Sequence, residues 1–217
     1  MLPDLRQITT VLLDMDGTLL DLHYDNFFWV QEIPRIYAEL NDLSNEDAVG
    51  YLKPLFLAQE GQLNWYSVDY WSDTLGLDVM HHKAEVADKI AWRPHAQEFL
   101  QLCQQHVPDT RLVTNGHRKV LHLKIKHTRL DRYFADMLCS HELSATKESQ
   151  EFWHRLRARK NFDPDKTLFI DDSERVLDSA AEFGIKHVFS IAQPDSVTPR
   201  TTKSKYPMLA SFPRLPN

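Results

Sequence analysis

Short apolar runs alternate with helical stretches through most of the chain, and this alternation constrains the fold more than any other feature. The runs lie at about Thr9–Asp14, Arg111–Thr114, Asp136–Ser140, Thr167–Asp171 and Lys186–Ile191. Runs this short and this apolar are typical of strands buried on both faces. Strands that alternate with helices form right-handed βαβ units, with helices on both sides of a parallel sheet. The sequence therefore predicts an α/β fold with a doubly wound parallel sheet.

Residues 21–92 interrupt this alternation, because they carry helical periodicity and almost no strand signal. Ser44 and Asp47 have the spacing of a capping pair and open one predicted helix. Gly76 ends another, and a shorter helix is expected from Lys83 to Ala91. We interpret this block as a helical cap inserted into the sheet domain.

The chain is thus expected to have two domains. A discontinuous catalytic core covers residues 1–20 and 93–217, and the cap covers residues 21–92. From Gln193 onward no hydrophobic period survives, so the tail is expected to be irregular coil or partly disordered.

Composition excludes several kinds of partner. The 217 residues include 25 basic and 31 acidic side chains, a formal charge of −6, and such a surface repels nucleic acid. No stretch is long and apolar enough for a membrane span, and the first residues do not read as a signal peptide. Cys103 and Cys139 are expected to be buried reduced thiols. We therefore expect a cytoplasmic protein with no nucleic-acid or membrane partner.

Asp14 comes directly after the apolar run Val11–Leu13, and a second aspartate, Asp16, follows two residues later. Gly17 then lets the chain turn without a clash at Cβ. Ligands of open α/β sheets bind at the carboxyl ends of the strands, so both acids are expected in a site. An aspartate there can attack phosphorus, and a second can pass a proton to the leaving oxygen. A solvated turn is the alternative interpretation.

Three further strand ends carry polar side chains. Thr114 and Asn115, with nearby backbone N–H groups, could hold phosphate oxygens, although these residues taken alone favour a helix cap. Lys147 follows the next run, where a solvated lysine is the ordinary interpretation. Asp171 and Asp172 end the fourth run, and like charges this close need a cation or a proton between them.

This set of motifs resembles the haloacid dehalogenase-like hydrolase superfamily of aspartate-nucleophile phosphatases, from about Val11 to Ile191. The first and fourth motifs carry most of the resemblance. In the third, Glu148 follows the lysine where the superfamily usually has proline. Two cap stretches, Leu63–Tyr66 and Asp69–Ser72, are similar to bacterial GMP/IMP-type purine 5′-nucleotidases of this superfamily. The resemblance implies a Rossmann-like core with a helical cap, and a phosphoric monoester hydrolase of the 5′-nucleotidase type.

The resemblance implies catalytic roles at the strand ends. Asp14 is the implied nucleophile, which forms an aspartyl-phosphate, and Asp16 is the general acid and base. Thr114 and Lys147 are implied to be catalytic and, with Asn115, to bind the phosphate of the substrate.

The resemblance also implies Mg²⁺ as the cofactor. Its ligands would be Asp14, the backbone carbonyl of Asp16, and Asp172, with Asp171 close by or linked through water. Which of Asp171 and Asp172 binds the metal directly stays open. Other histidine-rich metal sites are not expected, because beyond one adjacent pair the histidines have no metal-type spacing and are interpreted as surface or capping residues: His23, His81, His82, His95 and His141.

The implied substrate is a purine nucleoside 5′-monophosphate such as GMP or IMP, selected by the cap. Aromatic faces stack on bases, although aromatic residues at helical spacing more often pack in a core. The candidates for substrate contact are Asn26, Trp29 and Tyr66, with Trp65, Tyr70 and Trp71 also considered.

Several alternatives remain at this level. Asp16 favours an oxygen leaving group over a halide, but a broad sugar phosphate phosphatase and a phosphomutase would both keep it. An inactive relative serving as an interaction module is disfavoured, because the motif residues are intact. Oligomeric state is not indicated.

Overall fold

The computed structural model describes residues 2–214 and contains one parallel sheet with the strand order β3-β2-β1-β4-β5-β6. Its strands are β1 (Thr10–Leu13), β2 (Asp109–Thr114), β3 (Asp136–Cys139), β4 (Thr167–Asp171), β5 (His187–Ile191) and β6 (Met208–Leu209). The predicted doubly wound α/β architecture is confirmed.

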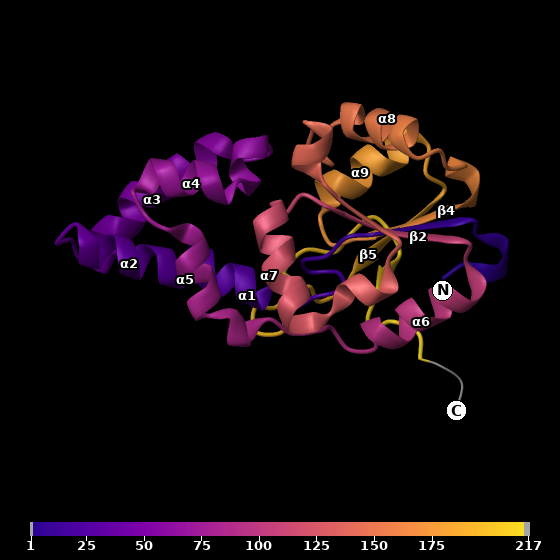
Figure 1. The fold of residues 1–217 in the computed structure, drawn as a ribbon, viewed down its shortest axis with the longest axis horizontal. Coiled ribbons are helices and arrows are strands. Elements are labelled where there is room, and N and C mark those ends of the chain that lie inside the picture. The colour runs from indigo at the N-terminus through magenta and orange to yellow at the C-terminus, as the bar shows by residue number, and fades with distance from the viewer. Residues whose placement is uncertain (1, 215–217) are drawn as a thin grey trace.

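Helices cover both faces of this sheet (Figure 1). On one face lie α6 (Ala96–His106) and α7 (Arg118–Thr128), and on the other lie α8 (Gln150–Arg159) and α9 (Glu174–Phe183). Along β1, Val11 and Leu13 join the apolar core under the first pair of helices, whereas Leu12 joins the core under the second. Side chains alternate between the faces of a strand, so a strand covered on both sides is apolar throughout.

The strand order brings the motif-bearing ends together. β1 lies between β2 and β4, with Leu13 paired to Leu112 on one side and to Ile170 on the other. The residues that follow these positions therefore emerge side by side at the carboxyl edge. The order of the strands reverses next to β1, which is where open α/β sheets bind their ligands.

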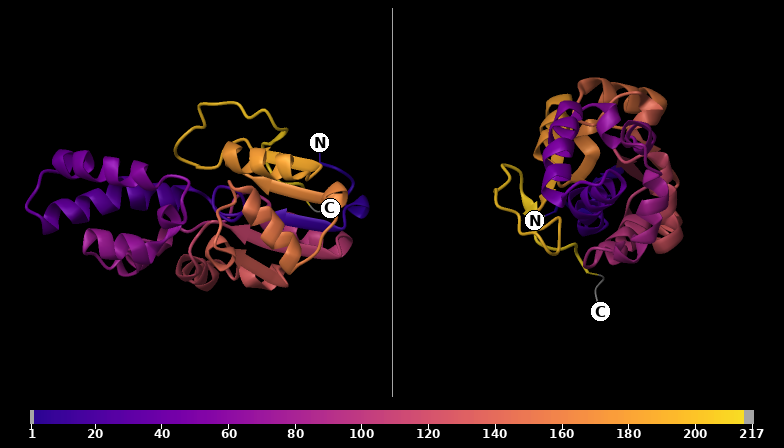
Figure 2. Two further views of the ribbon diagram at one scale, coloured as in Figure 1. Left: turned by 90° about the horizontal axis from the view of Figure 1, so that it is seen from above. Right: turned by 90° about the vertical axis from the view of Figure 1, so that its left-hand side faces the viewer.

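A second layer of helices lies beyond the carboxyl ends of the strands (Figures 1 and 2). It contains α1 (His23–Phe27), the π-helical turn η2 (Phe28–Glu32), α2 (Ile33–Leu40), α3 (Asn45–Gln59), α4 (Val68–Leu75) and α5 (Val79–Glu85). The inserted helical cap that the sequence predicts is therefore present. Its own core packs Phe28, Trp71 and Val79 among other apolar residues.

The helix signals in this layer are only partly confirmed. Ser44 Oγ accepts from the backbone N–H of Asp47 at 3.1 Å at the start of α3, and Gly76 ends α4 with φ at 66°. The expected helix from Lys83 to Ala91 is misplaced, because α5 begins at Val79. Asp78 caps it by accepting from the backbone N–H of His81 at 2.9 Å.

Short 3₁₀ turns connect the longer elements at η1 (Leu5–Gln7), η3 (Leu63–Tyr66), η4 (Ala87–Lys89), η5 (Leu130–Tyr133), η6 (Ser140–Leu143) and η7 (Pro164–Lys166). Cys103 and Cys139 are buried and unpaired, as expected. Within residues 2–214, no helix has both the length and the apolar character needed to cross a bilayer.

The tail is more ordered than the sequence predicts. β6 pairs with β5 in parallel, and Leu209 and Phe212 are buried in the core. The segment before β6 runs beside α9 (Figure 2), where the Tyr206 hydroxyl donates to Asp178 at 2.7 Å. The prediction of irregular coil was wrong for β6, because a two-residue strand has no detectable period. Residues 215–217 of the predicted tail lie outside the described residues.

Candidate active site

Lys147 joins the first and fourth motifs. Its ammonium donates to Asp14, to Asp171 at 2.7 Å and to the carbonyl of Val113 at 3.2 Å. Lys147, Asp14 and Asp171 are all buried. Burial opposes the charge on Lys147, but the two carboxylates outweigh it and raise the pKa of the ammonium. The lysine that had no local signal in the sequence is therefore fixed between two strand ends.

The acids at this edge are buried, although water would solvate their ionised forms better. Burial raises the pKa of Asp14 to about 6 despite the nearby lysine, and burial also raises the pKa of Asp171. Lys147 attracts Asp172 only from a distance, since within residues 2–214 no cationic side chain lies at ion-pair distance from this carboxylate. Burial, with Asp171 and Asp14 nearby, raises its pKa well above the usual range.

Three of these acids could share a cation. Carboxylate oxygens of Asp14, Asp171 and Asp172 all lie within 4.8 Å of one another. Mg²⁺ prefers such oxygen donors, and a buried carboxylate without a partner costs several kcal/mol. The donor set therefore fits a divalent cation.

Gly17 allows the first loop to touch the acidic pair. Its φ is 77°, and a Cβ at this position would lie 2.5 Å from Asp172 Oδ2. A larger residue would have to displace that carboxylate.

The Thr114–Gly116 turn lies on the other side of Asp14. The backbone N–H of Gly116 donates to Thr114 Oγ1 at 2.9 Å, and Asn115 Oδ1 accepts from the backbone N–H of Lys147 at 2.9 Å. The helix-capping interpretation of Thr114 and Asn115 was wrong. His117 caps α7 instead, with its ring accepting from the backbone N–H of Lys119 at 3.4 Å.

Asp16 belongs to a separate line of charges that the sequence did not reveal. Lys124 on α7 donates to Asp16 and also to Asp25 in the cap, and Lys83 donates to Asp25 at 2.8 Å. Both lysines are about 1% exposed. Burial raises the pKa of Asp16 to about 6, although Lys124 opposes the shift. Asp14 and Asp16 are therefore each paired with a different lysine.

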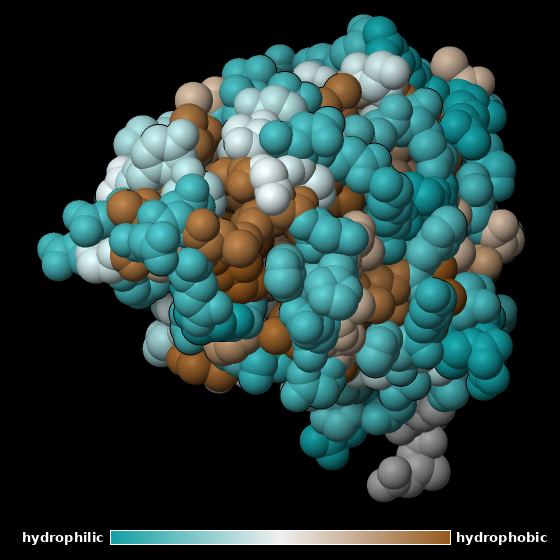
Figure 3. All heavy atoms as spheres, turned by 60° about the vertical axis from the view of Figure 1, so that its left-hand side comes forward, coloured by the Kyte–Doolittle hydropathy of each residue, from teal (hydrophilic) through white to brown (hydrophobic). Residues whose placement is uncertain are grey.

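A cavity of about 390 Å³ lies between these strand ends and the cap. Figure 3 shows apolar surface recessed between the two layers. All the sequence-predicted core residues line this cavity: Asp14, Asp16, Thr114, Asn115, Lys147, Asp171 and Asp172. Residues from both layers thus line one cavity.

The cap candidates divide into two groups. Asn26, Trp29 and Tyr66 line the cavity, together with Trp65 and Trp71. Tyr70 does not line it. Its ring packs edge-on against Trp71 at 5.0 Å, so the core-packing interpretation holds for this residue.

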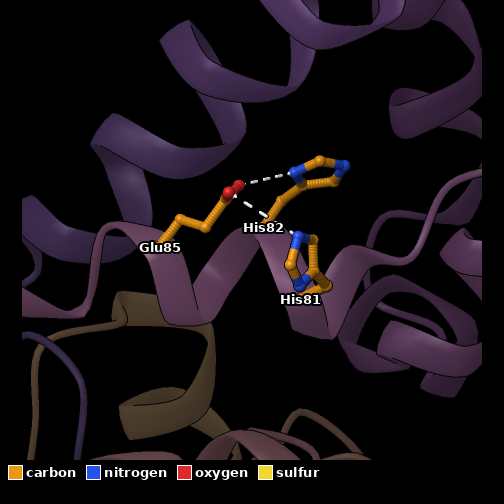
Figure 4. A group of neighbouring side chains, drawn as sticks. All are labelled: His81, His82 and Glu85. Carbon is orange, nitrogen blue, oxygen red and sulfur yellow. Dashed lines mark hydrogen bonds and ion pairs between the residues drawn. The ribbon is translucent and has the colours of Figure 1, made fainter.

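One histidine interpretation changes, and the adjacent histidine pair gains a neighbour. His81, His82 and Glu85 bring their ligand atoms within 4.8 Å of one another on α5 (Figure 4), so the adjacent pair has a third neighbour. Glu85 binds the His82 ring at 2.9 Å on an exposed helix surface, as an ordinary ion pair would. His141 was interpreted as a surface or capping residue, but both of its ring nitrogens are shielded from solvent, and its ring lies edge-on to His117.

Comparison with known proteins identifies the family of this chain. The family model described as haloacid dehalogenase-like hydrolase matches residues 8–184. The chain belongs to this family. It is therefore a hydrolase.

Two relatives that align with this hydrolase over nearly their whole length are named as nucleotidases. The chain is 36% identical over 210 residues to "GMP/IMP nucleotidase YrfG" from Escherichia coli (strain K12), covering 97% of this chain and 95% of that one. The Shigella flexneri protein of the same name matches equally well.

Solved structures share the fold of the hydrolase. A HAD phosphatase from Thermococcus onnurineus matches with a TM-score of 0.78 at 17% identity, over 94% of each chain. The magnesium-bound HAD hydrolase YfnB from Bacillus subtilis matches with a TM-score of 0.65 at 18% identity, over 94% of this chain and 95% of that one.

Four polar residues around the cavity of this hydrolase were missed from the sequence. Asp25, Lys83 and Lys124 form the second line of charges, and Glu148 connects the layers by accepting from the Tyr66 hydroxyl at 2.5 Å and from Asn115 Nδ2 at 2.9 Å. Their partners lie far away along the chain, so no local spacing could reveal them. The substitution of Glu148 for the expected proline was the one local signal.

Proposed function

We propose that this hydrolase is a Mg²⁺-dependent 5′-nucleotidase that removes the phosphate from purine nucleoside 5′-monophosphates, with GMP and IMP as substrates. The aromatic cavity next to the strand-end acids carries the proposal. The name of the Escherichia coli relative supports it, as does the similarity of the whole chain to that relative.

The cavity suits an aromatic base better than a sugar alone. Cap side chains of Trp29, Trp65 and Trp71 line it, along with Phe56. Stacking of a base on an aromatic face contributes about 1–3 kcal/mol where it has been measured. We propose Asn26, Trp29 and Tyr66 as substrate contacts, and residues 21–92 as a cap domain over a core of residues 1–20 and 93–217. Residues 1 and 215–217 of that core lie outside the described residues.

The proposed chemistry has two displacements at phosphorus. A carboxylate oxygen of Asp14 attacks phosphorus while the bond from phosphorus to the 5′ oxygen breaks, and Asp16 gives its proton to that oxygen. Water then attacks the aspartyl-phosphate, the bond from phosphorus to the Asp14 oxygen breaks, and Asp16 takes a proton from the water. Inorganic phosphate is released and both acids return to their starting state.

Other groups hold the phosphate during these steps. Lys147 contacts Asp14 directly, so its ammonium can offset charge that builds up on the phosphoryl oxygens. The Thr114 hydroxyl and the Asn115 side chain line the same space and are proposed to orient those oxygens.

Asp14, Asp171, Asp172 and the Asp16 carbonyl are the proposed magnesium ligands. Bound Mg²⁺ would supply a positive charge that neutralises phosphate oxygens close to Asp14. The magnesium-bound relative from Bacillus subtilis supports this choice of ion.

A substrate panel tests the function. Phosphate release is measured with GMP, IMP, AMP, CMP, ribose 5-phosphate and glucose 6-phosphate, with Mg²⁺ and with EDTA. We expect the largest kcat/KM for GMP and IMP, and loss of activity in EDTA. Equal values for nucleotides and sugar phosphates would point to a broad phosphatase. Transfer of phosphate between positions of a sugar, without release, would point to a phosphomutase.

A further inference from the structure

The line of charges from Asp16 into the cap includes a carboxylate that the proposed chemistry does not use. Asp25 accepts from Lys124 with one oxygen and from Lys83 with the other. Lys83 is enclosed by aromatic rings, with its ammonium 4.6 Å from the centre of Tyr24 and 4.4 Å from that of Phe28. Two buried lysines therefore fix the position of one aspartate.

Asp25 faces the cavity with spare hydrogen-bonding capacity. Its side chain is 17% exposed, against 1% for each lysine, and it lines the cavity. An ionised carboxylate has about four acceptor positions, and the two lysines occupy two of them. Burial favours the neutral form of Asp25, but both lysines outweigh burial and hold its pKa below the usual range. It is thus a pre-organised acceptor.

The position of Asp25 matches the sugar of a 5′-phosphorylated substrate. One lysine separates it from Asp16, which is proposed to protonate the leaving oxygen. The atoms that follow this oxygen in such a substrate belong to the pentose, and the base lies farther out, towards the aromatic wall. We propose that Asp25, held by Lys83 and Lys124, accepts hydrogen bonds from the 2′ and 3′ hydroxyls of the substrate and selects for a hydroxylated pentose.

Asn26 completes the polar side of this subsite. Its amide nitrogen donates to Asp195 at 2.6 Å, which fixes the side chain while it lines the cavity. If Asn26 served only to join the cap to the core through Asp195, its side chain would not need to reach the cavity surface. This inference rests on the proposed function, because it assumes a substrate whose leaving oxygen carries a pentose.

Hydroxyl deletion in the substrate tests the inference on the unmodified enzyme. kcat/KM is compared for GMP, 2′-deoxy-GMP and 2′,3′-dideoxy-GMP in Mg²⁺. A site that binds hydroxyls rejects analogues that lack them, so we expect at least about a ten-fold loss for the dideoxy compound. Equal values for the three nucleotides would overturn the inference.

A variant assigns the discrimination to Asp25. In Asp25→Asn, the ratio of kcat/KM for GMP to that for 2′,3′-dideoxy-GMP should fall to within about three-fold of unity. Both kcat/KM values are measured on the same protein sample, so a lower concentration of folded enzyme affects them equally and does not change their ratio. The same substitution at the exposed cap residue Asp88 is the matched control and should keep the parent ratio. A parent-like ratio in Asp25→Asn would overturn the assignment. If that variant cannot be purified, the same ratio is measured in Lys83→Met. This substitution frees the Asp25 carboxylate from one of its two lysines, so the enzyme should again lose its discrimination between the two nucleotides.

The proposed function and this inference can fail separately. The hydroxyl test is repeated with ribose 5-phosphate and 2-deoxyribose 5-phosphate. If the enzyme prefers no nucleotide but still favours the hydroxylated pentose, the nucleotidase proposal fails and the role of Asp25 stands. If nucleotides are preferred and neither pair is discriminated, only the role of Asp25 fails.

Discussion

At the scale of single residues, Asp14 and Asp16 show how two neighbouring acids can be given different surroundings. Both have a pKa raised to about 6, because burial outweighs the attraction of a lysine. Lys147 reaches Asp14 from the loop after β3, and Lys124 reaches Asp16 from α7. Each acid can therefore be altered while the other keeps its partner.

Replacement of Asp14 by Asn should abolish turnover. The amide cannot act as the nucleophile, so kcat should fall by at least about 10³-fold. Lys147 keeps its contact with Asp171, so the thermal midpoint should stay close to that of the parent. Phosphate release and a thermal melt measure the two quantities. A variant that hydrolyses GMP as fast as the parent would show that Asp14 is not the nucleophile.

Replacement of Lys124 by Met should destabilise the fold strongly. It leaves Asp16 and Asp25 without the buried cation between them, and breaking a buried ion pair from one side costs about 3–5 kcal/mol. Urea unfolding gives the free energy. Lys126→Met, an exposed position on the same helix, is the control and should change it by less than about 0.5 kcal/mol. Equal effects of the two substitutions would argue against a structural role for Lys124.

The sequence could predict the strand-end residues but not the charges that hold them. Asp14, Asp16 and the Asp171–Asp172 pair each follow an apolar run, so local order alone marks them. Lys124 contacts Asp16 across 108 positions of the chain and contacts Asp25 across 99. Such contacts depend on how the cap docks on the sheet, which no local pattern encodes.

At the scale of elements, one hydrogen-bonded bridge joins the cap to the loops that are proposed to bind phosphate. Tyr66 in η3 donates to Glu148, which also accepts from Asn115, and Asn115 binds the backbone N–H of Lys147. Burial raises the pKa of the Tyr66 hydroxyl, and the Glu148 carboxylate adds to the shift, so it remains a donor at neutral pH. The position of the cap and that of Lys147 are therefore linked.

This link predicts that Tyr66→Phe and Glu148→Gln act on the same interaction. Each variant should lower kcat/KM for GMP several-fold. The kcat/KM of the double variant should be no lower than that of the less active single variant. The missing additivity should correspond to a coupling of about 0.5–3 kcal/mol. Steady-state kinetics on the four proteins measure it. Glu151→Gln on the exposed side of α8 is the control, and fully additive effects of Tyr66→Phe and Glu148→Gln would mean that the bridge has no role in turnover.

Helices and strands were predictable from the sequence where burial gives them a hydrophobic period and capping residues mark their ends. β4 was predicted with its observed bounds, and Ser44 and Gly76 marked helix ends correctly. α5 was misplaced because its cap, Asp78, lies so close to Gly76 that the sequence around it does not separate the end of one helix from the start of the next. β6 was missed because its order comes from pairing with β5, and not from its own sequence.

At the scale of the whole molecule, the site concentrates negative charge where the two layers meet. Asp14 and Asp171 share one lysine beside Asp172, which has no ion pair within residues 2–214, whereas Asp16 and Asp25 have two lysines between them. The first group therefore carries the excess of negative charge, and it is the group whose donor oxygens fit a divalent cation. Cation binding and proton binding should compete at this place.

This competition predicts that stabilisation by Mg²⁺ grows with pH. Burial raises the pKa of Asp14 to about 6 and that of Asp172 well above its usual range. Asp14 and Asp172 thus bind more protons in the folded protein than in the unfolded chain from about pH 4 up to their raised pKa values, and without metal these acids cost stability as pH rises through about pH 6. Mg²⁺ binds the ionised acids and releases those protons.

The thermal midpoint should therefore rise on adding saturating Mg²⁺ by more at about pH 7 than at about pH 5. Scanning calorimetry with Mg²⁺ and with EDTA measures this difference, and titrating histidines outside the site contribute equally to both arms. Asp172→Asn removes the unpaired carboxylate, so it should raise the midpoint in EDTA and reduce the gain from Mg²⁺. If the gain from Mg²⁺ is the same at both pH values, protons and the cation do not share these carboxylates, and the proposed metal ligands are wrong.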